Sequence, residues 1–467
     1  MAVSLTLALL IPVQAAPARP AMAGPSGPWP PPLPGVDGTV MLSDRGFLRI
    51  PREVRQRLSE PGAEPFDVAR RAPTVDLAFH RELPHDGRNR TGWTTWGDIA
   101  VAADGRVYSG IGDHGDDAAG TANAYIYQWD PETRELRQVV DVNRVGPREG
   151  GEPGWSKVHA RIDAADDGWI YFSGTLNNGQ RAGAADYRWT ASLPGGQLLR
   201  HHPDSGRSEV FASLPPARAT ATSLLDRHHN RWWCNLEAGD GNALWAIDLE
   251  TGEPVMQSDD GVVTENRNFM LAADGSVIFN GEGGFWRADP RTGGVARTRS
   301  ALPDHGNVRA STRESADGHI YGITYRPGRL FRYHPGRDEL RMLGNDFLLG
   351  DYTPVIALSP DERFLYYMPG AHGQARTIGT PVVQYHIASG RRKVLAFLRD
   401  PIESRHDYVP AGTYGLKVSA DGRTLYTCIN GHPGDDHRPE HLSPNGFGLT
   451  AFLAIHIPER ELEDPEQ

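Results

Sequence analysis

The sequence predicts an all-β protein, a seven-bladed β-propeller built from four-stranded blades. Two observations carry this prediction. A tight turn flanked by short apolar strands recurs seven times along the 467 residues. Each copy is followed by a third strand, a second turn and further strand-like sequence, so that one unit holds about four strands. A pair of β-sandwiches or a β-helix would not give a two-turn unit repeated seven times.

Residues 157–173, KVHARIDAADDGWIYFS, show the first turn most clearly. Alternating apolar residues lead into Asp166-Asp167-Gly168, and a second apolar run follows it. Alternation with a period of two is typical of a strand, and Asp-Gly supplies the positive φ that a two-residue hairpin needs. The seven turns are Asp104-Gly105, Asp167-Gly168, His229-Asn230, Asp274-Gly275, Asp317-Gly318, Asp361-Glu362 and Asp421-Gly422.

The third strands run into a second turn, as in YQWDPETRE, WAIDLETGE and WRADPRTGG. Aromatic or aliphatic residues before Asp-Pro or Thr-Gly are typical of a strand that ends in a turn. The seventh unit stops at FLAIHIPE and lacks a fourth strand. Residues 75–83 or 38–48 are the candidates to complete it, because a closed ring leaves no free strand edge. We therefore expect one propeller domain over residues 38–467, closed by an N-terminal strand.

The N-terminal residues resemble an export signal. Residues 3–13 form an apolar run that is too short to span a bilayer, and small residues follow it. We expect a signal peptide over residues 1–23, a Pro-rich linker over residues 24–37, and a secreted or periplasmic protein. No other segment is apolar and long enough to cross a membrane. We expect a monomer.

Charge and cysteine content exclude some partners. The net charge of −11 argues against nucleic acid, although a locally basic cleft could still hold an anionic substrate. Cys234 and Cys428 occupy equivalent strands of blades that are not neighbours in a seven-fold ring. Since a disulfide needs Cα atoms within about 7 Å, we predict two buried free thiols.

Propeller geometry predicts which face carries function. The long connections, residues 112–123, 143–157, 177–195, 369–380, 400–412 and 431–446, all fall on one face. Function on rigid scaffolds tends to lie on such loops. The innermost strand of each blade starts on this face. Its first residues are Asp98, His159, Thr222, Asn268, Arg309, Tyr352 with Thr353, and Tyr414.

These side chains predict a catalytic funnel. His159, Tyr414, Arg309 and Tyr352 are the catalytic candidates, because Tyr or His can move a proton and Arg can neutralise a carboxylate bidentately. The substrate-binding candidates on the same face are Asn268, Asn177, His406, Tyr408 and His372. The alternative is that each of these residues is structural.

Two loops are rich in metal-ligand atoms. Blade 1 contributes GIGDHGDD and blade 7 contributes NGHPGDDHRPEH, and ring closure makes these blades neighbours. Mixed imidazole and carboxylate ligands suit Zn²⁺ or Mn²⁺, and carboxylates alone suit Ca²⁺. The alternative is a pair of solvated acidic loops. The candidate metal ligands are Asp113, His114, His432, Asp435 and His437.

Residues 95–457 resemble the secreted seven-bladed propellers of the gluconolactonase-like and streptogramin-lyase-like type, a group that includes ulvan and oligogalacturonate lyases. The run Lys157-Val158-His159, with the Asp-Gly hairpin and Tyr171-Phe172 after it, resembles the inner-strand histidine region of the propeller lyases. The chain departs from ulvan lyases after the next strand, where it reads Thr175-Leu176-Asn177-Asn178 instead of presenting a second histidine.

Three functions follow as alternatives. The first is a carbon–oxygen lyase that cleaves a uronic-acid-containing polysaccharide by β-elimination, with Arg309 neutralising the carboxylate and His159 or Tyr414 taking the proton. The second is a propeller that binds a glycan or a protein without catalysis. The third is a metal-dependent lactonase-type hydrolase, which would need acidic ligands at the channel floor, with Asp98 as a candidate.

Overall fold

The computed structural model describes residues 38–81, 83, 93–113, 122–145, 154–175, 195–216, 218–220, 222–237, 242–434 and 447–464. The chain divides into two units, Met1–Pro32 and Leu33–Gln467, and every described residue belongs to the second. The predicted signal peptide and linker lie outside the described residues. None of the described helices has the length and apolar character needed to cross a membrane.

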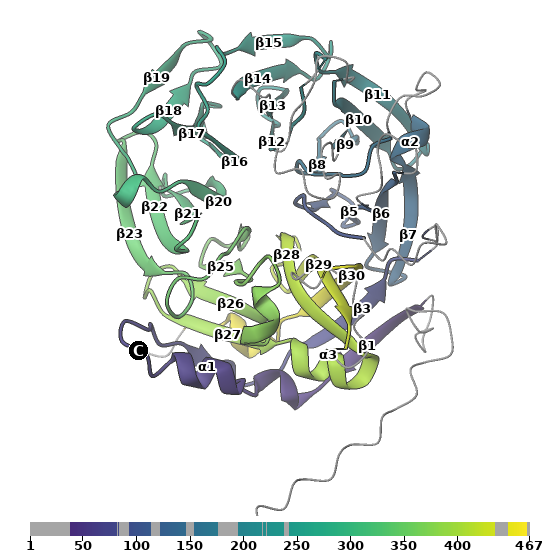
Figure 1. Cartoon of the computed structure of the whole chain (residues 1–467), viewed down its shortest axis with the longest axis vertical. Helices are drawn as coiled ribbons and strands as arrows, with labels where there is room; N and C mark the ends of the chain where they lie inside the picture. Colours follow the sequence, from purple (N-terminus) through teal and green to yellow (C-terminus); the bar gives the residue numbers. More distant parts are fainter. Residues whose placement is uncertain are drawn as a thin grey trace, which may run out of the picture. The chain divides into compact units, whose positions relative to one another are not determined.

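Seven antiparallel sheets form a ring in the second unit, as the repeats predict (Figure 1). The strands of each blade are given from the inner one outward. Blade 1 contains β4 (Ala100–Val101), β5 (Val107–Gly112), β6 (Ala124–Asp130) and β7 (Glu135–Asp141), and blade 2 contains β8 (Asp163–Ala164), β9 (Ile170–Gly174), β10 (Gln197–His202) and β11 (Arg207–Ser213). Blade 3 contains β12 (Ser223–Asp226), β13 (Arg231–Leu236), β14 (Ala243–Asp248) and β15 (Pro254–Gln257), and blade 4 contains β16 (Glu265–Leu271), β17 (Val277–Gly281), β18 (Gly284–Ala288) and β19 (Val295–Arg297).

The last three blades follow the same order. They are β20 (Val308–Glu314), β21 (Ile320–Thr324), β22 (Arg329–His334) and β23 (Glu339–Asn345); β24 (Ile356–Leu358), β25 (Phe364–Tyr367), β26 (Pro381–His386) and β27 (Arg392–Phe397); and β28 (Tyr408–Val418), β29 (Thr424–Pro433) and β30 (Leu449–His456), which the N-terminal strands complete.

The predicted hairpin turns are present in every blade. Each turn contains one residue with a positive φ. This residue is Gly in five turns, Asn230 (φ 54°) in blade 3 and Glu362 (φ 59°) in blade 6. In all six Asp-containing turns the Asp carboxylate accepts a hydrogen bond from the backbone N–H two residues ahead, as Asp167 does from Trp169 at 2.9 Å. This local bond explains why Asp precedes the left-handed residue.

Both N-terminal candidates join the seventh blade. β3 (Thr74–Phe79) pairs antiparallel with β30 as the fourth strand, and β1 (Thr39–Ser43) pairs with β3 as a fifth. The buried Asp76 carboxylate of β3 binds Arg134 of blade 1 and His456 of blade 7. The prediction that an N-terminal strand closes the ring is therefore confirmed, and the strand also links blades 7 and 1.

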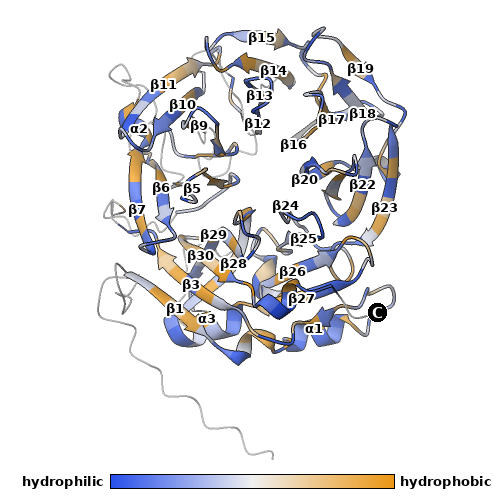
Figure 2. Ribbon diagram, turned by 180° about the vertical axis from the view of Figure 1, so that it is seen from behind, coloured by the Kyte–Doolittle hydropathy of each residue, from blue (hydrophilic) through white to orange (hydrophobic). Residues whose placement is uncertain are grey.

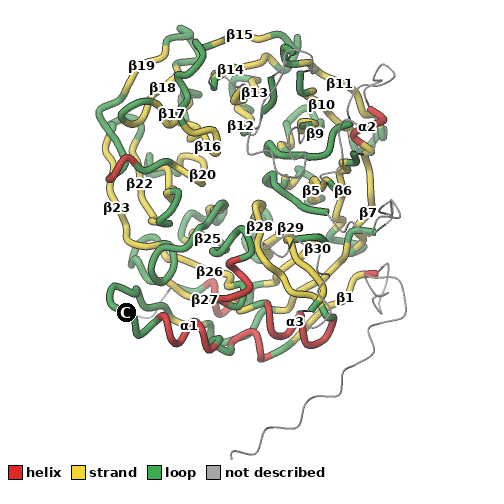
Figure 3. The backbone as a smooth tube through the Cα atoms, in the orientation of Figure 1, coloured by secondary structure: helices red, strands yellow, loops and turns green. Residues whose placement is uncertain are grey.

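The N-terminal segment also covers blade 6. It contains η2 (Arg45–Leu48), α1 (Arg52–Arg57) and β2 (Asp67–Val68), and β2 adds a parallel fifth strand to β27. Figure 3 shows α1 and α3 (Arg399–His406) beside blades 6 and 7. The remaining helical turns are α2 (Val142–Val145), η4 (Pro303–His305), η5 (Gln374–Ile378) and η7 (Glu459–Leu462).

The core lies between neighbouring blades. Hydrophobic clusters join blades 1 and 2, 2 and 3, and so on round the ring, with Trp129 of blade 1 stacked on Phe452 of blade 7 at 5.0 Å. Outer strands such as β7, β11 and β23 carry both hydrophobic and hydrophilic residues (Figure 2). Cys234 and Cys428 are buried and free, as predicted.

Candidate functional site

The inner strands that face the central channel are interrupted by irregular pairing. In β16 the register shifts between Glu265 and Met270, and β20 and β28 each contain two shifts. A bulge breaks the alternation of a strand and redirects side chains. In β16 this brings two consecutive residues, Arg267 and Asn268, to the channel.

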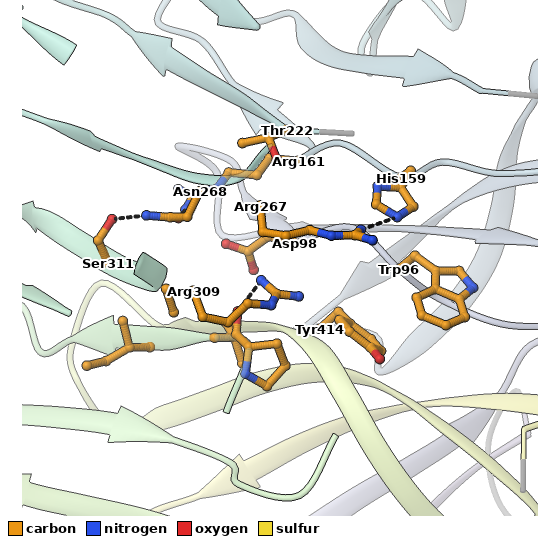
Figure 4. Close-up of a pocket in the computed structure, with 14 residues that line it drawn as sticks. Trp96, Asp98, His159, Arg161, Thr222, Arg267, Asn268, Arg309, Ser311 and Tyr414 are labelled. Carbon is orange, nitrogen blue, oxygen red and sulfur yellow. Dashed lines mark hydrogen bonds between the residues drawn. The ribbon is translucent and has the colours of Figure 1, made fainter. Parts of the chain in front are cut away.

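Fourteen residues from all seven blades line a cavity in this channel (Figure 4). Inner strands start on the loop-rich face, so an earlier residue of a strand lies nearer that face. We call Trp96, His159, Arg267, Arg309 and Tyr414 the mouth. We call Asp98, Arg161, Asn268 and Ser311 the floor.

Floor residues are bonded to one another across blades. The Arg161 guanidinium donates to Asn268 Oδ1 at 2.7 Å, and Asn268 Nδ2 donates to Ser311 Oγ at 2.8 Å. Asp98 forms an ion pair with Lys417 and accepts bonds from the backbone N–H groups of Ile99 and Leu416. Most polar groups of the floor are therefore hydrogen-bonded within the protein. We expect a ligand to interact mainly with the residues of the mouth.

Arg267 extends over the mouth from blade 4 to blade 2 (Figure 4). Its Nη1 lies 2.9 Å from His159 Nε2. A guanidinium has donors only, so His159 Nε2 must accept this bond and carries no proton. The free volume between the lining side chains is about 40 Å³. This volume is smaller than a sugar ring, and the Arg267 side chain lies across the cavity.

Arg309 is a buried cation with unusual partners. The residue is 8% exposed, its Nε donates to the Tyr352 hydroxyl at 2.6 Å, and its Nη1 donates to Pro354 O at 3.3 Å. Its guanidinium also lies over the Tyr352 and Tyr414 rings, 5.4 and 5.8 Å from their centroids. Among the described residues it has no carboxylate partner. A buried charge without a counter-ion is costly, and an anionic ligand would remove that cost.

Aromatic rings form one side of the mouth. Trp96 packs on Tyr414 at 4.9 Å, and His372 stacks on Tyr352 at 5.1 Å while its edge meets Tyr414 at 5.7 Å. Such rings can support sugar rings as well as cations. Tyr325 extends the cluster by an edge-to-face contact with Tyr352 at 5.2 Å.

Burial shifts the pKa of two groups in this cluster, Tyr414 and His372. Burial, with the nearby Tyr352, raises the pKa of Tyr414 well above its usual value, so that its phenol stays protonated. Burial, together with the positive charges of Arg326, Arg309 and Arg267, lowers the pKa of His372 to about 4. His372 is therefore neutral near pH 7.

The structure brings the four catalytic candidates together. His159, Arg309 and Tyr414 line the cavity, and Tyr352 holds Arg309. Of the binding candidates, Asn268 lies in the floor and His372 packs against Tyr414 and Tyr352.

The other binding candidates do not line this cavity. Tyr408 lies in β28 and is fully buried, with its hydroxyl 3.2 Å from the carbonyl oxygens of Ile429 and Leu449. His406 is the last residue of α3, in a connection that we expected to be a loop. Asn177 lies outside the described residues. Substrate binding by these three residues stays a prediction.

The predicted metal ligands are only partly described. The Asp113 carboxylate accepts bonds from Asn123 N (2.9 Å) and Nδ2 (2.7 Å), and His432 is buried at the end of β29. His114, Asp435 and His437 lie outside the described residues. Within the described part of the chain, no group of three or more His, Cys, Asp or Glu could hold a metal ion. Blades 1 and 7 are neighbours, with Asn430 Oδ1 accepting a bond from Thr95 N at 2.8 Å.

Among the site residues that sequence reasoning missed, three arginine or tryptophan residues had a signal. Arg161 and Trp96 stand two positions from His159 and Asp98, and therefore lie on the same side of their strands. Arg326 follows a strand on the loop-rich face, in a connection too short to attract notice. Arg267 had no such signal, because only the bulge in β16 turns it to the channel.

No protein-family model matches the chain, and no curated protein matches it in sequence. Solved structures do match its fold. An oligogalacturonate lyase in complex with manganese is 12% identical, with a TM-score of 0.50 over 86% of this chain and 97% of that one. An extracellular domain from B. thetaiotaomicron is 12% identical, with a TM-score of 0.47 over 77% of this chain and 38% of that one.

A set of WD40 repeats is 9% identical, with a TM-score of 0.47 over 82% of this chain and 97% of that one. The chain thus spans less than half of the matched extracellular protein and nearly all of the other two. At such identities the likeness shows the fold alone, since propellers share one scaffold among unrelated functions.

Proposed function

We propose that the protein is a carbon–oxygen lyase that cleaves a uronic-acid-containing polysaccharide by β-elimination at the mouth of its channel. The observation that carries the proposal is the set of arginines at the channel. Arg267, Arg309 and Arg326 form no ion pair with a carboxylate among the described residues, although the chain has a net charge of −11. They converge with His159, whose Nε2 contacts Arg267, and with Tyr414, whose phenol is protonated.

The substrate carboxylate is the natural partner of Arg309 and Arg267. A carboxylate binds a guanidinium more strongly than a neutral imidazole does, because the bond is charge-assisted and can be bidentate. It would draw Arg267 away from His159 and leave Nε2 free to accept a proton. Neutralising the carboxylate also lowers the pKa of the C–H beside it. Arg267 thus couples substrate binding to the release of the base.

The elimination then needs a base and an acid. His159 Nε2 takes the proton from the carbon next to the carboxylate, and the electron pair forms the new carbon–carbon double bond. The bond to the neighbouring sugar's oxygen breaks, and that oxygen takes a proton from the Tyr414 hydroxyl. A raised pKa makes Tyr414 a proton donor rather than the base in the resting protein. Tyr352 positions Arg309 through the 2.6 Å bond to its Nε.

The alternatives fit the site less well. A lactonase-type hydrolase would draw on Asp98, which is engaged by Lys417 and two backbone N–H groups. A propeller that only binds glycans would not need a histidine, a tyrosine and arginines gathered at one mouth. The oligogalacturonate lyase among the structural neighbours and the expected secretion are consistent with the proposal.

A divalent metal at Asp113, His114, His432, Asp435 and His437 stays a prediction. A bound cation there could add Lewis-acid stabilisation to a substrate carboxylate. In the reaction proposed above, Arg309 and Arg267 stabilise the substrate carboxylate instead. The assay is therefore run with and without a chelator, to show whether a metal ion is also needed.

The proposal is tested by incubating the purified protein with a panel of uronic-acid polysaccharides, with and without chelator. Cleavage produces an unsaturated uronate, which absorbs in the ultraviolet. We expect His159→Ala and Tyr414→Phe each to lower the rate by about 10²–10⁴-fold, the usual contribution of a general base or acid. The matched control is His228→Ala, an exposed histidine in a turn on the opposite face, which should keep full activity. A rise in absorbance that survives His159→Ala, or no rise on any substrate, would contradict the proposal.

A further inference from the structure

A short loop beside the mouth presents an arginine on two aromatic rings. Tyr325 and Arg326 lie between β21 and β22, in a connection on the same face as the mouth. The Arg326 guanidinium lies 5.4 Å from the Tyr325 ring centroid and 5.0 Å from that of Tyr352. The side chain is exposed, and it forms no ion pair with a carboxylate in the described part of the chain.

The backbone of Arg326 adopts a conformation that non-glycine residues rarely occupy. Its φ is 34°, in the left-handed region. Such a conformation persists only where the surroundings enforce it, and it is frequent at ligand sites. Here the two tyrosine rings hold the side chain in place. The two ring contacts orient the guanidinium beside the mouth.

This arginine adjoins the proposed catalytic arginine. Arg309 lies over the same Tyr352 ring at 5.4 Å and donates to its hydroxyl. His372 stacks on that ring, and the charges of both arginines lower its pKa. Two guanidinium groups that lack carboxylate partners among the described residues therefore contact the same aromatic ring, which is about the size of a sugar ring.

We propose that Arg326, with Tyr325, forms a second carboxylate subsite next to Arg309, so that the preferred ligand carries uronates on neighbouring sugar units. The Arg326 guanidinium binds the carboxylate of the second unit, and the exposed side of Tyr325 supports its ring. This inference rests on the proposed function, because it assumes that Arg309 binds a uronate. It narrows the proposed substrate from any uronic-acid-containing polysaccharide to one with consecutive uronates, as opposed to uronates that alternate with neutral sugars.

The test measures binding by titration calorimetry, using monosaccharides and trisaccharides of galacturonate, glucuronate and mannuronate. With the trisaccharide that the wild-type protein binds best, we expect Arg326→Ala to weaken binding by about tenfold or more, as for a lost charge-assisted bond. The affinity for the monosaccharide should stay unchanged. Arg309→Ala should weaken binding of both. Methyl-esterified trisaccharide should bind wild type and Arg326→Ala equally.

Arg341→Ala, which removes an exposed arginine of the outer strand β23, is the matched control and should bind like wild type. Arg326→Lys, which keeps the charge, should restore part of the trisaccharide affinity. The subsite is overturned if Arg326→Ala binds the trisaccharide as wild type does, or loses monosaccharide affinity equally. Cleavage by the wild-type protein distinguishes failure of the subsite from failure of the proposed function. If the protein cleaves a uronate polysaccharide but Arg326→Ala changes neither cleavage nor binding, the lyase function stands and the subsite is wrong.

Discussion

At the scale of single residues, the mouth is organised by arginines that reach across the channel. Arg161 of blade 2 bonds to Asn268 of blade 4, and Arg267 of blade 4 bonds to His159 of blade 2. Between them blade 3 contributes only the small Thr222. Two long side chains thus fill the space that a small residue leaves open. One bond belongs to the floor, and the other occupies Nε2 of the proposed base.

The pKa of His372 depends on the positive charges near the mouth. Its pKa of about 4 reflects burial and the three arginines Arg326, Arg309 and Arg267. A uronate bound to those arginines cancels part of their charge, so the pKa of His372 should rise towards its usual value of 6.5. NMR titration of the imidazole resonances, with and without a uronate trisaccharide, measures this shift.

The imidazole resonances of His228, on the opposite face, should not respond to the trisaccharide. In Arg326→Ala the free protein should already show a raised pKa for His372, because one of the three positive charges is gone. A pKa of His372 that does not move when the trisaccharide saturates the protein would place the carboxylates elsewhere.

At the scale of elements, the site depends on how closely the inner strands of neighbouring blades approach. Gly97 stands between Trp96 of the mouth and Asp98 of the floor. A Cβ at this position would lie 2.2 Å from the carbonyl oxygen of Ala160, between His159 and Arg161. Glycine is required here by the close approach of two backbones. The contact aligns the site residues of blade 1 with those of blade 2.

Gly97→Ala should therefore push the two inner strands apart. We expect a loss of about 1–3 kcal/mol in the free energy of unfolding, as for overpacked sites, with a fall in cleavage rate. Urea denaturation and the absorbance assay measure the two effects. The control is Gly294→Ala in the exposed turn between β18 and β19, where the nearest atom is the Thr292 hydroxyl at 3.1 Å. Equal stability of the two variants would show that the strands can separate freely.

At the scale of the whole molecule, the described ring is closed where blade 7 meets blade 1. His80 follows β3 at this junction and is fully buried, with its ring edge-on to Tyr127 of blade 1 at 4.6 Å and its Nε2 3.9 Å from Cys428 Sγ of blade 7. Burial lowers the pKa of His80 to about 4. Protonation would place a charge inside the junction that closes the ring.

Acid should therefore destabilise the protein at this junction. Between pH 6.5 and pH 4 the unfolded chain binds a proton at His80 and the folded chain does not, so stability falls as the pH falls through this range. The full effect is at most about 3 kcal/mol. Urea denaturation at pH 7 and pH 5 should show a smaller loss in His80→Gln than in wild type.

His201→Gln offers a comparison away from the junction, since burial also lowers the pKa of His201 to about 4. It should reduce the pH dependence in the same direction, and the two effects should add because the sites are distant. An unchanged pH dependence in His80→Gln would show that the junction does not sense acid.

The sequence by itself determined the repeat and therefore the fold. A hairpin turn is specified by residues two or three positions apart, so Asp-Gly, His229-Asn230 and Asp361-Glu362 could be read as turns without knowledge of the rest of the chain. Seven such units fix the number of blades. The same order of strands fixes which residues begin each inner strand, and His159, Arg309 and Tyr414 were found in that way.

Only the tertiary structure decided how these residues combine. Arg267 reaches the channel because of a bulge, and its partner His159 lies 108 positions away in another blade. Arg326 adjoins the mouth because Tyr352, from the next blade, lies beneath it. Both β1 and β3 enter the last blade, where the sequence predicted that one segment would. Pairing between distant segments depends on packing that no local pattern encodes, and the proposed site is made of such pairings.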